Sequence, residues 1–303
     1  MASSEGPQEL DLLVTEARGS ADDYDRRSTQ ELVELMNAGD LAVPAVVGAA
    51  ADTIAAAIDA IVERLQRGGR LVYAGAGSSG RIAALDADEC EATFSTQPGQ
   101  VVALVAGGAL ASPLEQERAE DDAEAGRRAV SALDVSDADA VVGISASGRT
   151  PFVLGALEAA RAAGASTACI VSAPGSQLAG LAEHEIEVVV GPELVAGSTR
   201  LKAGTAQKLV LNTISTVSMI RLGKTFGDLM VDVRASNEKL EARARRIVSV
   251  ATGASAEEAE RALAAADGSA KVAIVSLLGG VDAETARSRL DESKDDIRSA
   301  LRR

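Results

Sequence analysis

The middle of the chain contains five short apolar runs, and their pattern predicts the strands of a central sheet. Their residues are apolar throughout instead of alternating with polar ones, as in parallel strands covered on both faces. Helical patterns fill most of the intervals, so the order of elements predicts a doubly wound parallel sheet with ligands beyond the carboxyl ends of its strands. The predicted strands are 70–74, 101–106, 140–144, 167–172 and 186–190, and the helices between them are 114–130, 151–163 and 202–222.

Helical patterns also flank the sheet on both sides. Ser28 and Glu31 form a capping box in front of apolar residues at helical spacing. From about residue 237 the strand pattern stops, and a second capping box, Ser255 with Glu258, opens one of several short Ala-rich helices. The predicted C-terminal helices are 237–251, 256–266, 269–278 and 282–301. We therefore expect an N-terminal arm (1–27), an α/β domain (28–236) and a small C-terminal helical, UBA-like domain (237–303).

The composition of the 303-residue chain excludes several kinds of function. Hydrophobic residues make up 47% and aromatic residues only 2%, so stacking on nucleobases is not expected. The formal net charge is −15 and no basic face is visible, so no nucleic-acid partner is expected. An anionic small molecule would need a local site, which backbone N–H groups at helix N-termini form without net positive charge.

The few chemically distinctive residues narrow the picture further. Cys90 and Cys169 do not form a CxxC pair, which is typical of reduced thiols in a reducing compartment. His184 is the single histidine, so neither a metal site nor a Ser-His-Asp triad is expected, and no cofactor is implied. The first residues lack the pattern of a signal peptide, and no run of about 18 apolar residues predicts a membrane span. These features predict a cytoplasmic protein with no membrane partner.

Two serine-rich turns stand where predicted strands run into predicted helices. The first is Gly75–Arg81 and contains Gly77, Ser78 and Ser79; the second is Ser145–Thr150 and contains Ser147 and Gly148. Glycines let a backbone approach an anion closely, hydroxyls donate to it, and a helix N-terminus adds partial positive charge. Taken singly, the first fits a tight connecting turn and the second fits N-capping by Ser147 or Thr150. Two such turns in one parallel sheet favour phosphate binding.

The GxGSS and SxSGxT turns resemble the two phosphate-cradling loops of the sugar isomerase (SIS) domain family. The resemblance implies a three-layer αβα sandwich around a five-stranded parallel sheet, a phosphosugar ligand and a homodimer. It also implies which side chains contact the phosphate: Ser78, Ser79, Ser145, Ser147 and Thr150.

Longer segments are similar to the family of N-acetylmuramic acid 6-phosphate etherases, over about residues 14–300. These segments are Gly75–Arg81, Leu85–Cys90, Ala119–Asp122, Gly143–Pro151, Gly197–Asn212 and Leu229–Val233. The resemblance implies a lyase that cleaves a D-lactyl ether by elimination and water addition, in cell-wall amino sugar recycling. It implies Glu89 as the proton donor and Glu120 as the second catalytic glutamate. Glu91-Ala92 and Arg118 depart from the family pattern, but neither catalytic position is changed.

Further residues and rival functions complete the expectations. If the helix after the first turn starts near Gly80, Glu89 falls at its end, near the pocket wall. Gly77, Gly148, Ser198, Arg200 and Lys202 are candidates for the substrate pocket, although Lys202 also fits an exposed helix position. One rival function is a non-catalytic phosphosugar-binding regulator of the glucokinase regulatory protein type, and another is a phosphosugar isomerase.

Overall fold

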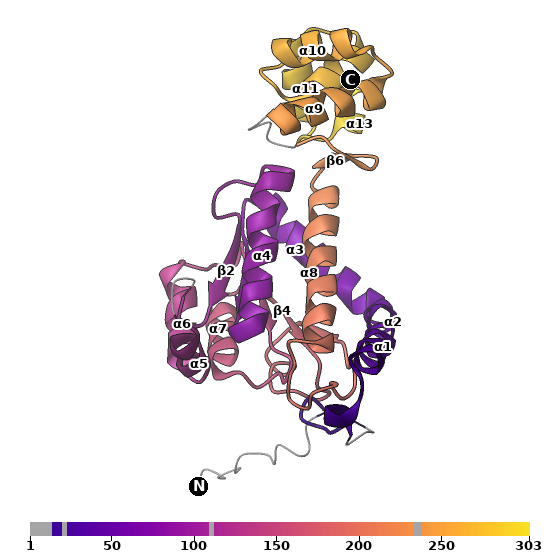
Figure 1. Cartoon of the computed structure of the whole chain (residues 1–303). Helices are drawn as coiled ribbons and strands as arrows, with labels where there is room; N and C mark the ends of the chain where they lie inside the picture. Colours follow the sequence, from indigo (N-terminus) through magenta and orange to yellow (C-terminus); the bar gives the residue numbers. More distant parts are fainter. Residues whose placement is uncertain (1–13, 20–22, 109–111, 233–237) are drawn as a thin grey trace. The chain divides into compact units, whose positions relative to one another are not determined.

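A five-stranded parallel sheet organises the larger part of the chain (Figure 1). The computed structural model describes residues 14–19, 23–108, 112–232 and 238–303. Every neighbouring pair of strands is parallel, in the order β2-β1-β3-β4-β5, which confirms the predicted parallel sheet. The strands are β1 (Leu71–Gly75), β2 (Val101–Val105), β3 (Ala140–Ile144), β4 (Ser166–Val171) and β5 (His184–Glu187).

Helices cover both faces of this sheet and make the predicted three-layer sandwich (Figure 1). Val72, Val141 and Cys169 pack on one face against α7 (Pro151–Ala162), which lies beside α6 (Ala123–Ala132). Tyr73 points to the opposite face, where its hydroxyl donates to Asp86 of α4 at 3.1 Å. The helices of that second layer are α3 (Ala51–Gln66), α4 (Gly77–Phe94) and α8 (Lys202–Arg221).

The chain reverses its direction of travel across the sheet at β1. From β1 it passes through α4 to β2 on one side, and then through α5 (Pro113–Glu120) and α6 to β3 on the other side. The carboxyl ends of β1 and β3 are therefore neighbours, with Gly75 in register with Ile144. This arrangement is a topological switch point, where open α/β sheets bind their ligands. Both serine-rich turns begin here.

Side-chain capping decides where several helices begin. The predicted capping boxes of Ser28 and Ser255 are confirmed at the starts of α1 (Thr29–Asp40) and α10 (Ala256–Ala265). The single helix predicted at 114–130 is wrong, because α5 ends at Glu120 and the Asp122 carboxylate accepts from the Ala125 N–H to start α6. The helix predicted at 282–301 is likewise two, α12 (Ala283–Glu292) and α13 (Ile297–Ala300), with Asp296 as the second cap.

The remaining chain belongs largely to a second compact unit, made of residues 88–98 and 215–303. Its core contains Val248, Ala273, Ile274 and Val275, all fully buried. It also contains a short hairpin of β6 (Thr225–Phe226) and β7 (Leu229–Met230), which sequence analysis did not predict, and the helices α9 (Glu238–Thr252) and α11 (Ala270–Gly279). The first unit also contains a 3-10 turn at Tyr24–Arg26 and α2 (Val43–Ala49).

Each of the two compact units combines two stretches of the chain. The first unit comprises residues 1–87 and 99–214, so the division falls within α4 and α8. The three domain ranges predicted from sequence stay a prediction. Of the predicted N-terminal arm, residues 1–13 and 20–22 lie outside the described residues.

One helical stretch among the described residues has the length and hydropathy of a membrane span. It is the stretch Thr29–Ala49, which comprises α1 and α2 with a turn between them, and an 18-residue window within it has a mean hydropathy of 1.4. The paired helices α10 and α11 pass the same criterion together but bend by 113°. A single stretch of this kind is weak evidence, because core helices and signal sequences share its length and composition.

Candidate functional site

The first serine-rich turn forms the start of α4. Gly77 has φ +52°, the left-handed region that glycine adopts without strain. Gly75 and Gly80 pack so closely that a Cβ atom on Gly80 would lie 2.7 Å from the Gly75 carbonyl oxygen. This contact brings the end of β1 onto the first turn of α4. Ser78 and Ser79 are half-buried there, beside N–H groups that have no acceptor within the helix.

The second serine-rich turn is held by hydrogen bonds around Ser145. The Ser145 Oγ accepts from the Gly148 N–H at 3.0 Å and lies 2.8 Å from the Thr150 hydroxyl and 3.4 Å from the Ser147 hydroxyl. Ser145 and Thr150 are buried, at 3% and 6% exposure. Thr150 is the N-cap residue of α7, but its side chain makes no capping hydrogen bond. The three hydroxyls therefore converge on one another, and the N-capping by Thr150 that the sequence also allowed is absent.

Glu120 connects the second turn to a carboxylate. The Thr150 hydroxyl donates to Glu120 Oε1 at 3.3 Å, and Glu120 Oε2 lies 4.0 Å from the Cβ position of Gly77. The break between α5 and α6 places Glu120 at the last position of α5. Glu120 therefore lies between the two turns.

The two turns and Glu120 line one cavity of about 220 Å³. Its ionisable lining side chains in the described part of the chain are both acidic, Glu16 and Glu120. A phosphate bound here would be held by hydroxyls and by the partial positive charge of the α4 N-terminus. The lining residues are Thr15, Glu16, Ala76, Gly77, Ser78, Ser79, Glu120, Ser145, Ala146, Ser147, Thr150 and Thr199.

Sequence reasoning missed three lining residues that lie outside the two turns, and within the turns it did not single out Ala76 and Ala146. Thr15 and Glu16 fall in the predicted arm, where no periodic or motif signal distinguishes them. Thr199 lies within the Gly197–Asn212 segment, but its neighbours Ser198, Arg200 and Lys202 were the predicted ones. Ser198 and Arg200 are not among the lining residues of the cavity, and Arg200 is exposed.

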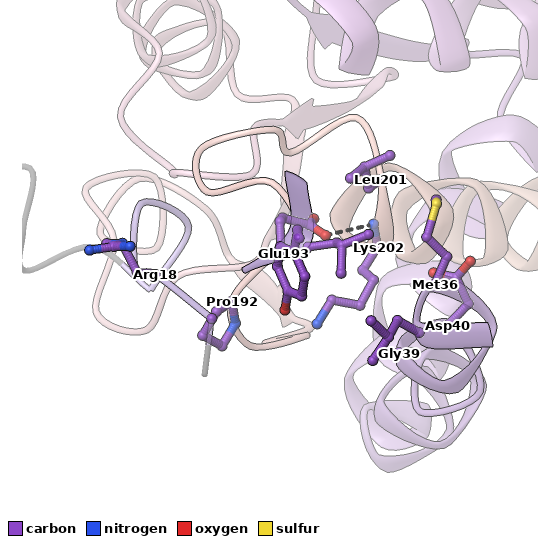
Figure 2. Close-up of a pocket in the computed structure, with 12 residues that line it drawn as sticks. Arg18, Met36, Gly39, Asp40, Pro192, Glu193, Leu201 and Lys202 are labelled. Atoms are coloured by element: carbon purple, nitrogen blue, oxygen red, sulfur yellow. Dashed lines mark hydrogen bonds between the residues drawn. The ribbon is translucent and has the colours of Figure 1, made fainter. Parts of the chain in front are cut away.

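Lys202 faces a different cavity, of about 520 Å³, next to α1 (Figure 2). Its ammonium donates to the Val190 carbonyl at 2.8 Å. Its backbone N–H and that of Ala203 donate to the buried Glu193 carboxylate at 3.0 and 2.9 Å. Glu193 thus caps the N-terminus of α8, and Lys202 fixes the segment before that helix. Neither side chain lines the serine-lined cavity.

Glu89 also lies outside the lining of the serine-lined cavity. It is exposed on α4, and the helix continues past it to Phe94. From residue 77 to residue 89 the helix rises by about 18 Å. Gly148 is not a lining residue either, but its N–H shapes the second turn through Ser145.

Other reactive groups are structural. Asp86 is buried and binds the Tyr73 hydroxyl and the Lys208 ammonium, the latter at 3.3 Å. Burial raises the pKa of the Cys169 thiol to about 12, so a thiolate nucleophile is not available there. Cys90 is buried and not in a disulfide.

Comparisons with known proteins identify the family and the fold of this chain. The family profile of the glucokinase regulatory protein N-terminal SIS domain matches residues 53–161, and that of the SIS domain matches residues 122–216. The N-acetylmuramic acid 6-phosphate etherase of Streptomyces avermitilis is 57% identical over 97% of this chain and 94% of its own length. That of Mycolicibacterium smegmatis is 51% identical over 97% of this chain and 99% of its own length. The structure of a phosphoheptose isomerase from Francisella tularensis aligns with a TM-score of 0.50 at 19% identity, over 64% of this chain and all of the isomerase, which shows the shared fold.

Proposed function

The chain belongs to the N-acetylmuramic acid 6-phosphate etherase family, and from that membership we propose that it cleaves the D-lactyl ether of N-acetylmuramic acid 6-phosphate. The products are N-acetylglucosamine 6-phosphate and D-lactate, and the reaction serves cell-wall amino sugar recycling. One observation carries the assignment to a site: Glu120 binds Thr150 in the cavity that both hydroxyl-bearing turns line.

The substrate phosphate binds at the switch point between β1 and β3. Ser78 and Ser79 contribute hydroxyls from the start of α4, and Ser145, Ser147 and Thr150 contribute theirs from the second turn. Binding energy from this remote group positions the reacting carbons of the sugar. Because the chain carries a net charge of −15, local dipoles and hydroxyls are needed to attract the dianion.

The reaction is an elimination followed by a hydration. In the open-chain sugar the C1 aldehyde acidifies the proton on C2, and a base removes that proton. The C3–O bond to lactate then breaks, with a proton delivered to the departing oxygen. Water adds to C3 of the resulting unsaturated aldehyde and returns a proton to C2. Two carboxyl groups suffice for these transfers if one of them starts protonated.

Glu120 acts at C2 of the sugar, because it is the one of the two glutamates that lines the cavity of its own chain. Glu89 protonates the ether oxygen and later handles the attacking water. The rise of about 18 Å along α4 separates Glu89 from the phosphate-binding end of its own helix, which is more than one sugar ring spans. A second copy of the chain therefore supplies Glu89, which agrees with the homodimer expected from the sequence.

The activity is tested by incubating the protein with N-acetylmuramic acid 6-phosphate and assaying D-lactate. We expect release by the wild type and a loss in kcat of about 10²–10⁴ for Glu120→Gln, because one acid–base group is removed. Undiminished turnover by Glu120→Gln or by Glu89→Ala would contradict its assigned role. Absence of D-lactate with tight sugar phosphate binding would favour the regulator instead, and formation of a ketose phosphate would favour an isomerase.

The shared site is tested by mixing two inactive variants. Glu89→Ala and Glu120→Ala are produced separately, then unfolded and refolded together. Mixed dimers contain one site with both glutamates intact if the two residues come from different copies, so activity returns. If both residues act from one copy, the mixture stays inactive and the two-copy site is wrong. Each variant refolded alone is the control.

A further inference from the structure

The N-terminal segment contributes a wall of the serine-lined cavity. Thr15 and Glu16 line it together with the two turns and Glu120. A backbone hydrogen bond holds the segment in place, with the Gly197 N–H donating to the Thr15 carbonyl at 3.1 Å. The Ala17 N–H donates to the Val14 carbonyl at 3.3 Å and closes a turn around the two residues.

Gly197 leaves the space that the Glu16 carboxylate occupies. Gly197 has φ +76°, and a Cβ atom built on it would lie 2.7 Å from Glu16 Oε2. Any larger residue at this position would push the carboxylate away. The backbone before α8 therefore leaves room for Glu16 at Gly197, and Thr199, two residues further on, lines the same cavity.

The charge of Glu16 decides which part of a ligand it contacts. A carboxylate offers only hydrogen-bond acceptors and is repelled by a phosphate dianion. The phosphate binds at the α4 N-terminus, so Glu16 faces the hydroxyl and acetamido groups of the sugar and neither of its anionic groups. The donors available there are hydroxyl groups and an amide N–H.

Thr15 provides an independent sign that this wall is built for a ligand. Thr15 is 4% exposed, and its hydroxyl has no hydrogen-bond partner among the residues that the structure describes. Buried hydroxyls are nearly always paired, and an unpaired one is costly. The oxygen has no accessible surface in this structure, so a ligand oxygen would pair with it only after a local movement of the segment.

We propose that Glu16 is a positioning residue that accepts a hydrogen bond from a hydroxyl or the acetamido N–H of the bound sugar phosphate, on a segment anchored by Thr15. The substrate class in this proposal rests on the proposed function. The role differs from that of Glu120, because Glu16 orients the sugar and transfers no proton.

The test measures binding by calorimetry, independently of turnover. The probes are N-acetylglucosamine 6-phosphate, glucose 6-phosphate and inorganic phosphate. Glu16→Ala should weaken the binding of N-acetylglucosamine 6-phosphate by about tenfold or more, which is the loss typical of a hydrogen bond to a charged group. The same variant should bind inorganic phosphate with unchanged or higher affinity. An equal loss for glucose 6-phosphate identifies a hydroxyl donor, and a loss confined to the acetamido sugar identifies the N–H. Glu34→Ala, which removes an exposed glutamate of α1, is the matched control.

A second variant tests the geometry without touching Glu16. Gly197→Ala should displace the Glu16 carboxylate and weaken the binding of N-acetylglucosamine 6-phosphate by a similar factor. The double variant with Glu16→Ala should lose little further affinity. Gly191→Ala is the control, because Gly191 has φ +70° and open space around its Cβ position.

The inference would be overturned if Glu16→Ala bound both sugar phosphates as tightly as the wild type does. It would also be overturned if the variant lost affinity for inorganic phosphate by the same factor as for the sugar phosphates. A wild type that binds N-acetylglucosamine 6-phosphate but releases no D-lactate would contradict the proposed function alone. A wild type that binds no sugar phosphate would refute both.

Discussion

Gly148 offers a quantitative test of how the second serine-rich turn is held. Its φ is +66°, and a Cβ atom there would lie 2.3 Å from Ser176 Cβ and 2.5 Å from Ser176 Oγ. Ser176 has little freedom to move, because its Oγ accepts from the Ala179 N–H and the Leu178 N–H donates to the Gly148 carbonyl at 3.1 Å. Gly148→Ala must therefore displace backbone.

The loss of stability expected for Gly148→Ala is the sum of two separate costs. The left-handed backbone costs a non-glycine residue about 1–2 kcal/mol. Forcing a methyl group into a packed site costs about 1–3 kcal/mol more, so the total for Gly148→Ala is about 2–5 kcal/mol. Gly175 is the matched control, because it has φ +61° with nothing within 4 Å of its Cβ position. Gly175→Ala should carry only the backbone cost of about 1–2 kcal/mol.

Thermal unfolding and substrate kinetics together check this prediction. For a unit of about 200 residues, the extra clash should lower the Tm of Gly148→Ala by about 2–12 °C relative to Gly175→Ala. The KM for the sugar phosphate should rise in Gly148→Ala alone, because the Gly148 N–H orders Ser145. Adding Ser176→Gly should recover part of both effects. Equal Tm and KM values for the two alanine variants would refute the reasoning.

Three further predictions concern buried charges. Asp139 is 2% exposed; burial alone would raise its pKa, but hydrogen bonds from Arg70 and from a loop N–H outweigh burial and hold that pKa below its ordinary value. Asp139→Asn should therefore lower Tm at neutral pH, and the difference from wild type should shrink as pH falls below about 4. Burial and a neighbouring carboxylate raise the pKa of Glu185, so the ionised form of this side chain destabilises the fold. Glu185→Gln should therefore raise the Tm at pH 7. This difference in Tm should disappear as the pH falls through the raised pKa. In the wild type the buried Lys271 ammonium lies 2.8 Å from the Asp232 carboxylate. Asp232→Asn removes that charge partner and should lower the free energy of unfolding by about 3–5 kcal/mol, measured by denaturant unfolding followed by circular dichroism.

The sequence by itself determined the parallel sheet and the two serine-rich turns. Strands that are buried on both faces must be apolar throughout, and a strand that runs into a helix start leaves a local glycine and serine signal. The capping boxes of Ser28 and Ser255 were readable for the same reason, since a cap is made by residues three positions apart. The hydroxyls of Ser145 and Thr150 converge within six residues of chain, so their contact was also predictable.

The tertiary structure alone decided which distant residues share the cavity. Thr15 meets Gly197 through a single backbone hydrogen bond between segments far apart in the chain, and no local pattern records such a contact. Lys202 was expected at the substrate, but it faces the cavity next to α1, because the direction of a side chain at a helix start depends on how that helix packs. Glu89 lies on the helix that the first serine-rich turn opens, yet the fixed rise of an α-helix carries it away from that turn. Spacing along a chain specifies local geometry, whereas long-range packing selects the side chains that meet.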